Sequence, residues 1–249
     1  MSGSGEPSAP ARILWLDMVR AAALAGMVVF HFVFDLQVFG VLPVGTASSG
    51  VWSILAHVVA GGFICIAGLS LVIAHPDVVR WRSFGRRLAK VAGAALLVTV
   101  ATYAMMPEFF VYFGILHAIA TFSLLGLAFL RAPLWLVVVA AVAVFFGGDA
   151  LRSESFNAPA LWWLGLSTQT APSVDFEPLF PWFSVFLAGL ILGRLATASG
   201  WLQRAMRYAP SRQRGLAAGV LWAGRHTLLL YLVHQPVLFA LIWTGLQIL

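Results

Sequence analysis

Seven long apolar runs dominate the sequence, and a helix of about 20 apolar residues is long enough to cross a lipid bilayer. Hydrophobic residues make up 61% of the chain and charged residues 10%, with a mean hydropathy of +0.93, which excludes an ordinary soluble domain. We therefore predict an all-α, polytopic membrane helical bundle of about seven or eight transmembrane helices. The runs lie at 13–36, 51–74, 88–106, 111–130, 133–148, 179–198 and 227–248.

The segments outside these runs are short. Residues 1–12 are rich in Ser, Gly, Pro and Ala, a composition that predicts a disordered tail. Residues 13–249 are then expected to form a single transmembrane domain. The segment 158–167 contains two tryptophans and is too short to cross a bilayer, so we expect it at the interface or in a re-entrant position. Residues 216–223 either extend the last run or form an eighth element.

Arginine and lysine gather in alternate connections, which predicts how the chain is oriented. Five basic residues lie between 80 and 90, five lie between 204 and 225, and Arg131 falls on the same side. The 37–50 connection has no basic residue, and the 149–178 loop has one arginine among four acidic residues. Because basic loops stay in the cytoplasm, we expect the N-terminus on the cytoplasmic side. The membrane is expected to be the cytoplasmic (inner) membrane. These loops account for the net charge of +6, so no nucleic-acid partner is expected.

Four ionisable residues interrupt the first apolar run: Asp17, Arg20, His31 and Asp35. The eleven residue steps from Arg20 to His31 make about three helical turns, so both lie on one face, about 16 Å apart. The spacing also allows pairs between Asp17 and Arg20 and between His31 and Asp35. Structural ion pairing and a lined functional cavity both remain open, and four such residues on one helix favour the cavity.

Other candidates lie further along the chain. His117 begins the fourth run near the depth expected for His31, and Asp175 enters the sixth run beside prolines that set a rigid turn. A lone histidine in a helix is more often a packing residue, and helix-entry chemistry explains much of the run around Asp175. Arg86 and Arg87 either mark the cytoplasmic side or hold the phosphates of a cytosolic cofactor. The sequence has no HExxH motif and no Cys/His cluster, so we expect no metal.

Four blocks, in order along the chain, resemble a known family. The first joins Arg12-Ile-Leu-Trp-Leu-Asp-Met-Val-Arg20 to Met27-Val-Val-Phe-His-Phe-Val-Phe-Asp-Leu36. It is similar to the first helix of the heparan-alpha-glucosaminide N-acetyltransferase-like membrane proteins of bacteria, a group of transmembrane acyltransferases. Phe113-Gly-Ile-Leu-His-Ala-Ile-Ala120, residues 175–182 and the 224–236 block around Arg-His and His-Gln-Pro are similar to later blocks of that family.

The resemblance implies acyl transfer across a membrane. Acetyl-CoA would act as the acyl donor from the cytosol, and an amine or hydroxyl of a sugar or glycan would accept the acetyl group on the other side. Three arginines would then face the CoA phosphates or the path inward: Arg20, Arg86 and Arg87.

The resemblance also implies roles at the acceptor end. His31 would be the catalytic base or a transient acyl carrier, and Asp35 would orient it. His117 and Asp175 would assist beside the acceptor. Membrane lipids and a further copy of the chain in a homo-oligomer are the other expected partners.

A different class of protein stays open from the residues alone. The same buried charges would also suit a non-enzymatic membrane protein, such as a small transporter or a partner subunit, in which they form a proton or solute path. Transporters often have paired halves with interrupted helices in matching positions. The charge pattern of the first run is not echoed in the second half of the chain.

Overall fold

The computed structural model describes residues 14–207 and 215–248, so the predicted tail at 1–12 lies outside the described residues. The described chain is helical and contains no β-strand, and six helices are long and apolar enough to cross a membrane. The predicted all-α membrane bundle is confirmed. The α-helices are α1 (Leu14–Val38), α2 (Gly50–Ala74), α3 (Trp81–Met105), α4 (Ile115–Gly126), α5 (Leu134–Leu151), α6 (Leu179–Ala198), α7 (Trp201–Arg207), α8 (Leu216–Arg225) and α9 (Thr227–Ile248).

The fourth apolar run, predicted at 111–130, forms a shorter helix than expected. Its first residues are extended and pair with the loop before α6, through Phe113 beside Phe176 and a bond from the Glu177 amide to the Phe113 carbonyl. Helix α4 therefore starts only at Ile115 and ends in a 3₁₀ turn at Leu127–Phe129. This pairing draws the 165–178 loop against the start of α4.

Helix α3 begins seven residues before the predicted run at 88–106. The basic segment that was expected to be a cytoplasmic connection instead forms the first turns of the helix, from Trp81. Arg87 and Lys90 thus become neighbours on one helical face. This difference matters for the site because it gives both cations fixed directions.

Close glycine contacts hold α2 against α6 at the centre of the bundle. A Cβ added to Gly68 would lie 2.0 Å from the Phe186 carbonyl oxygen, and one added to Gly189 would lie 2.0 Å from the Cys65 carbonyl oxygen. Only glycine permits this approach, which is typical of helix packing in membranes. Helix α5 packs on α6 and leaves most of its other side chains exposed.

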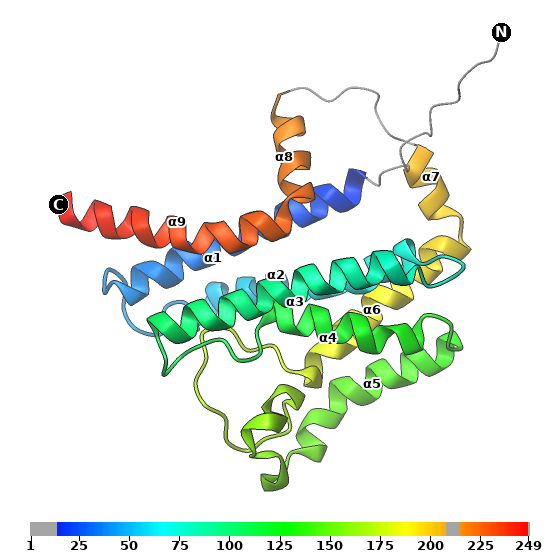
Figure 1. The fold of residues 1–249 in the computed structure, drawn as a ribbon, viewed down its shortest axis with the longest axis horizontal. Coiled ribbons are helices and arrows are strands. Elements are labelled where there is room, and N and C mark those ends of the chain that lie inside the picture. Colours follow the sequence, from blue (N-terminus) through cyan, green and yellow to red (C-terminus); the bar gives the residue numbers. More distant parts are fainter. Residues whose placement is uncertain (1–13, 208–214, 249) are drawn as a thin grey trace.

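The basic connections gather at one end of the bundle. The N-terminal end of α1, the α2–α3 turn, the α4–α5 turn and α7 all lie at the same end in Figure 1. Arg131 donates to the Asp77 carbonyl and Arg194 to the Ala132 carbonyl, which ties these connections together. The geometry groups the loops as the sequence predicts, while the side of the membrane they face stays a prediction.

Helix α8 is an element separate from α9. It runs in a different direction from α1 and α9 in Figure 1, and the chain turns at His226 before α9 runs along α1. Its last turn touches α1 so closely that a Cβ on Gly224 would lie 1.9 Å from the Asp17 carbonyl oxygen. The eighth element left open by the sequence is therefore present. The 158–167 segment contains a 3₁₀ helix at Pro159–Leu164.

Candidate active site

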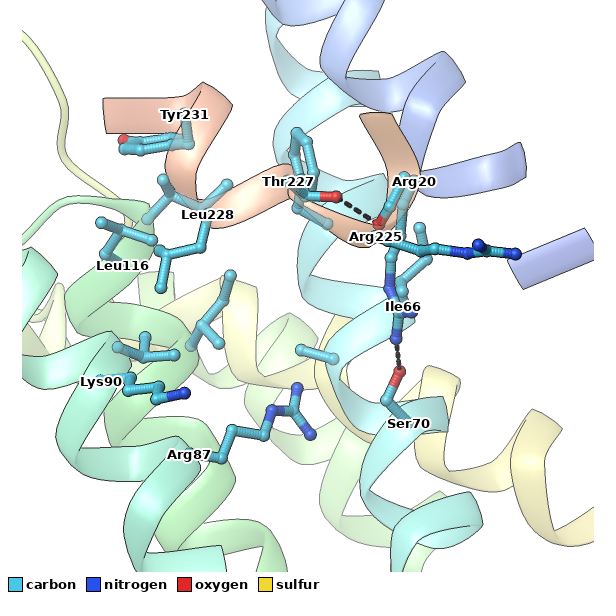
Figure 2. Close-up of a pocket in the computed structure, with 16 residues that line it drawn as sticks. Arg20, Ile66, Ser70, Arg87, Lys90, Leu116, Arg225, Thr227, Leu228 and Tyr231 are labelled. Atoms are coloured by element: carbon cyan, nitrogen blue, oxygen red, sulfur yellow. Dashed lines mark hydrogen bonds between the residues drawn. The ribbon is translucent and has the colours of Figure 1, made fainter. Parts of the chain in front are cut away.

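A cavity of about 290 Å³ lies between α1, α2, α3, α4 and the α8–α9 turn. Its lining within the described chain includes no acidic side chain and four cationic ones: Arg20, Arg87, Lys90 and Arg225. Apolar side chains form most of the remaining wall. Tyr231 and Ser70 lie on opposite sides of the cavity in Figure 2, and Arg87 and Lys90 reach toward it from α3.

The Asp17 carboxylate fixes two of the cations. It lies 3.3 Å from Arg20 Nη1 and 3.4 Å from Arg225 Nε, so the pair predicted within the first run is confirmed and α8 is joined to it. Arg20 also donates to Ser70 Oγ at 2.7 Å (Figure 2). Arg87 and Lys90 form no ion pair within the described residues. The cavity therefore has an excess of positive charge.

Arg86 lies outside the cavity. Its side chain is exposed, and its Nε donates to the Arg82 carbonyl at 3.3 Å. Successive residues point about 100° apart around a helix, so Arg86 and Arg87 cannot both face the same space. Of the three arginines expected to face CoA, the structure brings Arg20 and Arg87 together and places Arg86 elsewhere.

His31 is paired with a second histidine from α9. The rings of His31 and His234 have centroids 5.0 Å apart. His234 Nδ1 lies 2.6 Å from the Tyr231 carbonyl oxygen. His31 Nδ1 and His234 Nε2 are both buried without a hydrogen-bond partner. One nitrogen of each imidazole is thus buried and unbonded among the described contacts.

The interaction expected between His31 and Asp35 does not form among the described contacts. Asp35, which is 1% exposed, instead accepts a hydrogen bond from Gln235 Nε2 at 2.6 Å. The reason is that α9 lies against this face of α1 and brings an amide donor directly to the carboxylate. Asp35 therefore joins α1 to α9 beside the histidine pair rather than orienting His31 by a direct bond.

Asp175 lies at the N-terminus of α4 and connects it to α9. Its Oδ2 accepts from the Ile115 amide at 3.0 Å, where the helix dipole favours a negative charge. The Tyr231 hydroxyl lies close enough to this carboxyl for the two groups to interact electrostatically. A Cβ on Gly114 would lie 2.1 Å from Asp175 Oδ2, so a larger residue there would displace this carboxyl. Because the Tyr231 ring is 5.8 Å from that of His234, Tyr231 links the cavity, the histidines and Asp175.

Two carboxyl groups of the loop before α6 have raised pKa values. Burial raises the pKa of Asp175 to about 6, and the bond from the Ile115 amide acts in the opposite direction. Burial, with a further contribution from the Asp175 carboxylate, raises the pKa of Glu177 to about 9. Glu177 Oε2 is buried without a partner. At neutral pH the Glu177 carboxyl therefore keeps its proton.

His117 supports the start of α4. Its Nδ1 accepts from the Gly114 amide at 3.3 Å, and its Nε2 lies 3.1 Å from Thr99 Oγ1, which itself donates to the Val111 carbonyl at 2.7 Å. These bonds occupy both ring nitrogens and favour the Nε2–H tautomer. The structure thus places His117 next to the Asp175 site, with its described bonds directed to α3 and to the backbone.

The site residues predicted from the sequence left out six polar residues of this site, and among them Tyr231 had not been singled out at all: Lys90, Glu177, Arg225, Tyr231, His234 and Gln235. One signal was available, because residues 231, 234 and 235 are spaced to share one face of an otherwise apolar span. Within 14–207 and 215–248, the structure places no group of three or more His, Cys, Asp or Glu side chains to hold a metal ion.

The comparisons with known proteins agree with this geometry. The sequence model of the heparan-alpha-glucosaminide N-acetyltransferase catalytic domain matches residues 12–236. The chain belongs to this family. Searches of curated proteins and of solved structures found no significant match. The heparan-alpha-glucosaminide N-acetyltransferase match spans every residue of the site, and with the six apolar helices it indicates a multi-pass membrane protein with an acetyltransferase-type function.

Proposed function

We propose that the protein transfers an acetyl group from acetyl-CoA to an amine or hydroxyl of a sugar or glycan, from one side of the membrane to the other. The observation that carries this proposal is the continuity of the site. A cation-lined cavity reaches Tyr231, whose hydroxyl lies near the Asp175 carboxyl and whose ring is 5.8 Å from that of His234.

The cavity suits the phosphate-bearing part of CoA. One guanidinium group can donate two parallel hydrogen bonds to phosphate oxygens. Arg87 and Lys90 carry charges that no carboxylate balances within the described chain. Arg20 adds a third charge at the wall. A volume of about 290 Å³ is at the lower limit for a small-molecule site, so the cavity would enclose part of the donor. Its apolar walls would hold the uncharged arm that carries the thioester.

The histidine end suits the transfer step. The acceptor nitrogen or oxygen attacks the thioester carbonyl carbon, the new bond forms, the carbon–sulfur bond breaks, and the acceptor proton ends on the CoA thiol. His31 serves this exchange as the base that moves the proton or as the nucleophile that carries the acetyl group between donor and acceptor. Either role needs an unoccupied ring nitrogen, and His31 Nδ1 is buried without a partner.

The acceptor end is assigned to the loop before α6. Asp175 and Tyr231 would hydrogen-bond an amine or hydroxyl there, and the protonated Glu177 adds a further donor. His117 would keep α4 and the Asp175 carboxyl in place, and Asp35 would hold α9 against α1. We place the protein in the cytoplasmic (inner) membrane, surrounded by membrane lipids, with its basic end in the cytoplasm. The acceptor would then reach the site from the outer side.

The experiment measures acetyl-CoA binding and turnover by the purified protein in lipid nanodiscs. We expect saturable binding that free CoA displaces, and transfer of the radiolabelled acetyl group to glucosamine with release of CoA thiol. Absence of saturable binding would overturn the proposal. Proton-coupled solute flux in proteoliposomes without acetyl-CoA would instead favour the transporter class.

A further inference from the structure

His234 has the features of a reactive residue and has no part in the transfer step described so far. Its ring lies 5.0 Å from the ring of His31 and 5.8 Å from that of Tyr231, which lines the cavity. His234 therefore lies between the donor cavity and the Asp175 end of the site.

The protonation state of the His234 ring follows from its hydrogen bond. Nδ1 lies 2.6 Å from the Tyr231 carbonyl oxygen, and a carbonyl can only accept, so Nδ1 carries the hydrogen. In a neutral imidazole the lone pair is then on Nε2. This atom is buried and has no partner. A buried acceptor without a donor is unfavourable for folding, and such atoms call for an explanation beyond packing.

A hydrogen bond between the two helices fixes the position of this lone pair. The neighbouring Gln235 donates to Asp35 at 2.6 Å, which joins α9 to α1 one turn beyond His31. The backbone bond of His234 itself restrains rotation of its ring. Nε2 is thus held beside His31 before any substrate arrives, which is the preorganisation that proton transfer requires.

We infer that His234 is a second catalytic histidine, the base that takes the proton of the acceptor; this inference rests on the proposed function. As the acceptor nitrogen or oxygen bonds to the acetyl carbon, its proton passes to His234 Nε2. The bond from that carbon to its carrier breaks, whether the carrier is the CoA sulfur or the nitrogen of His31. The proton then passes from His234 to the released sulfur or nitrogen, and the ring returns to its neutral state.

The test compares substitutions that separate the two ring nitrogens. His234→Asn places an amide N–H where Nδ1 was, so it can keep the bond to the Tyr231 carbonyl while removing the Nε2 base. We expect His234→Asn to lower kcat for acetyl transfer by at least about 100-fold, with an unchanged Kd for acetyl-CoA. In His234→Ala, added imidazole should restore part of the lost rate.

A matched control is available in α2. His57 Nδ1 also lies close to a backbone carbonyl, that of Ser53 at 2.7 Å, but its side chain is exposed and does not line the cavity. His57→Asn should therefore keep full activity. If the wild-type protein is active and the His234→Asn variant keeps the same kcat, only the role of His234 is overturned. A wild-type protein that neither binds acetyl-CoA nor transfers the acetyl group would overturn the proposed function and this inference together.

Discussion

The two ends of the face that α1 turns to the site differ in how their charged and polar groups are satisfied. At the Arg20 end, the cations border an open cavity, and Asp17 holds two of them within 3.4 Å. At the His31 end, the polar groups are packed between helices, and atoms of His31, Asp35 and His234 are buried without partners. Under the proposed function, one end would bind the charged donor and the other would carry the reaction.

The energetic cost of the two arrangements also differs. A cation at the wall of a cavity has room for hydration, whereas a buried polar atom without a hydrogen bond costs about 1–3 kcal/mol. Several such atoms gathered around one pair of histidines are therefore a burden on folding. Their presence is best explained by a substrate that completes the missing hydrogen bonds. This contrast leads to three predictions.

The largest effect is expected at the histidine end. His31→Ala removes the nitrogen that would carry the proton or the acetyl group, so acetyl transfer should fall by at least about 100-fold. Binding of acetyl-CoA, measured by isothermal titration, should stay within about twofold because the cations are untouched. If a folded His31→Ala protein transferred the acetyl group at the wild-type rate, the His31 end would not be the reacting end of the site.

The next effect is expected at the cationic end. Arg87→Ala should weaken acetyl-CoA binding by about 10–100-fold, the loss of a charge-assisted contact of about 1.5–3 kcal/mol. Arg86→Ala is the matched control, because this neighbouring arginine lies on the same helix but does not line the cavity and is bonded to the Arg82 carbonyl. Titrations at two salt concentrations compare the variants. Equal losses in both would show that the cavity does not bind the donor.

The smallest effect concerns stability and pH at the acceptor end. The pKa of Glu177 is raised from its ordinary 4.5 to about 9, chiefly by burial, so the folded protein holds this proton more tightly than the unfolded chain. The contribution of Glu177 to stability is therefore fully present below pH 4.5 and decreases as the pH rises to about 9. Glu177→Gln, which stays neutral, should melt at a higher temperature than wild type, and the difference should grow over this range.

Thermal unfolding followed by tryptophan fluorescence measures this difference, at about 2–4 °C for each kcal/mol in a chain of this size. Glu154, an exposed glutamate of the same long loop, provides the control. Glu154→Gln should leave the midpoint unchanged. If the difference in melting temperature between Glu177→Gln and wild type did not vary with pH, Glu177 would be hydrated, as the groups at the cationic end are expected to be.

The first run shows how far sequence reasoning reaches. Helical spacing placed Arg20 and His31 on one side of α1 and paired Asp17 with Arg20, and the structure confirms that pair at 3.3 Å. The same spacing suggested a bond between His31 and Asp35, but Asp35 bonds Gln235, 200 residues away. Spacing within a helix states which groups can meet, and a neighbouring helix with a better-placed donor decides which of them do.

The arginines of α3 give a similar lesson. Sequence alone treated Arg86 and Arg87 as one basic group in a connection, because charge usually marks a loop in a membrane protein. Once the segment is helical from Trp81, one residue step separates a cavity-lining cation from one outside the cavity. The direction of each side chain depends on where the helix starts, and hydropathy does not show that.

The sequence by itself determined the membrane bundle, the runs that form its long helices, the family and the charged face of α1. These properties depend on hydropathy, spacing and local pattern, all of which are written along the chain. The tertiary structure decided that α9 lies along α1 and brings His234 and Gln235 to His31 and Asp35. It also brought Asp175 to Tyr231. Such partnerships depend on packing between distant helices, where shape and close approach select the neighbour.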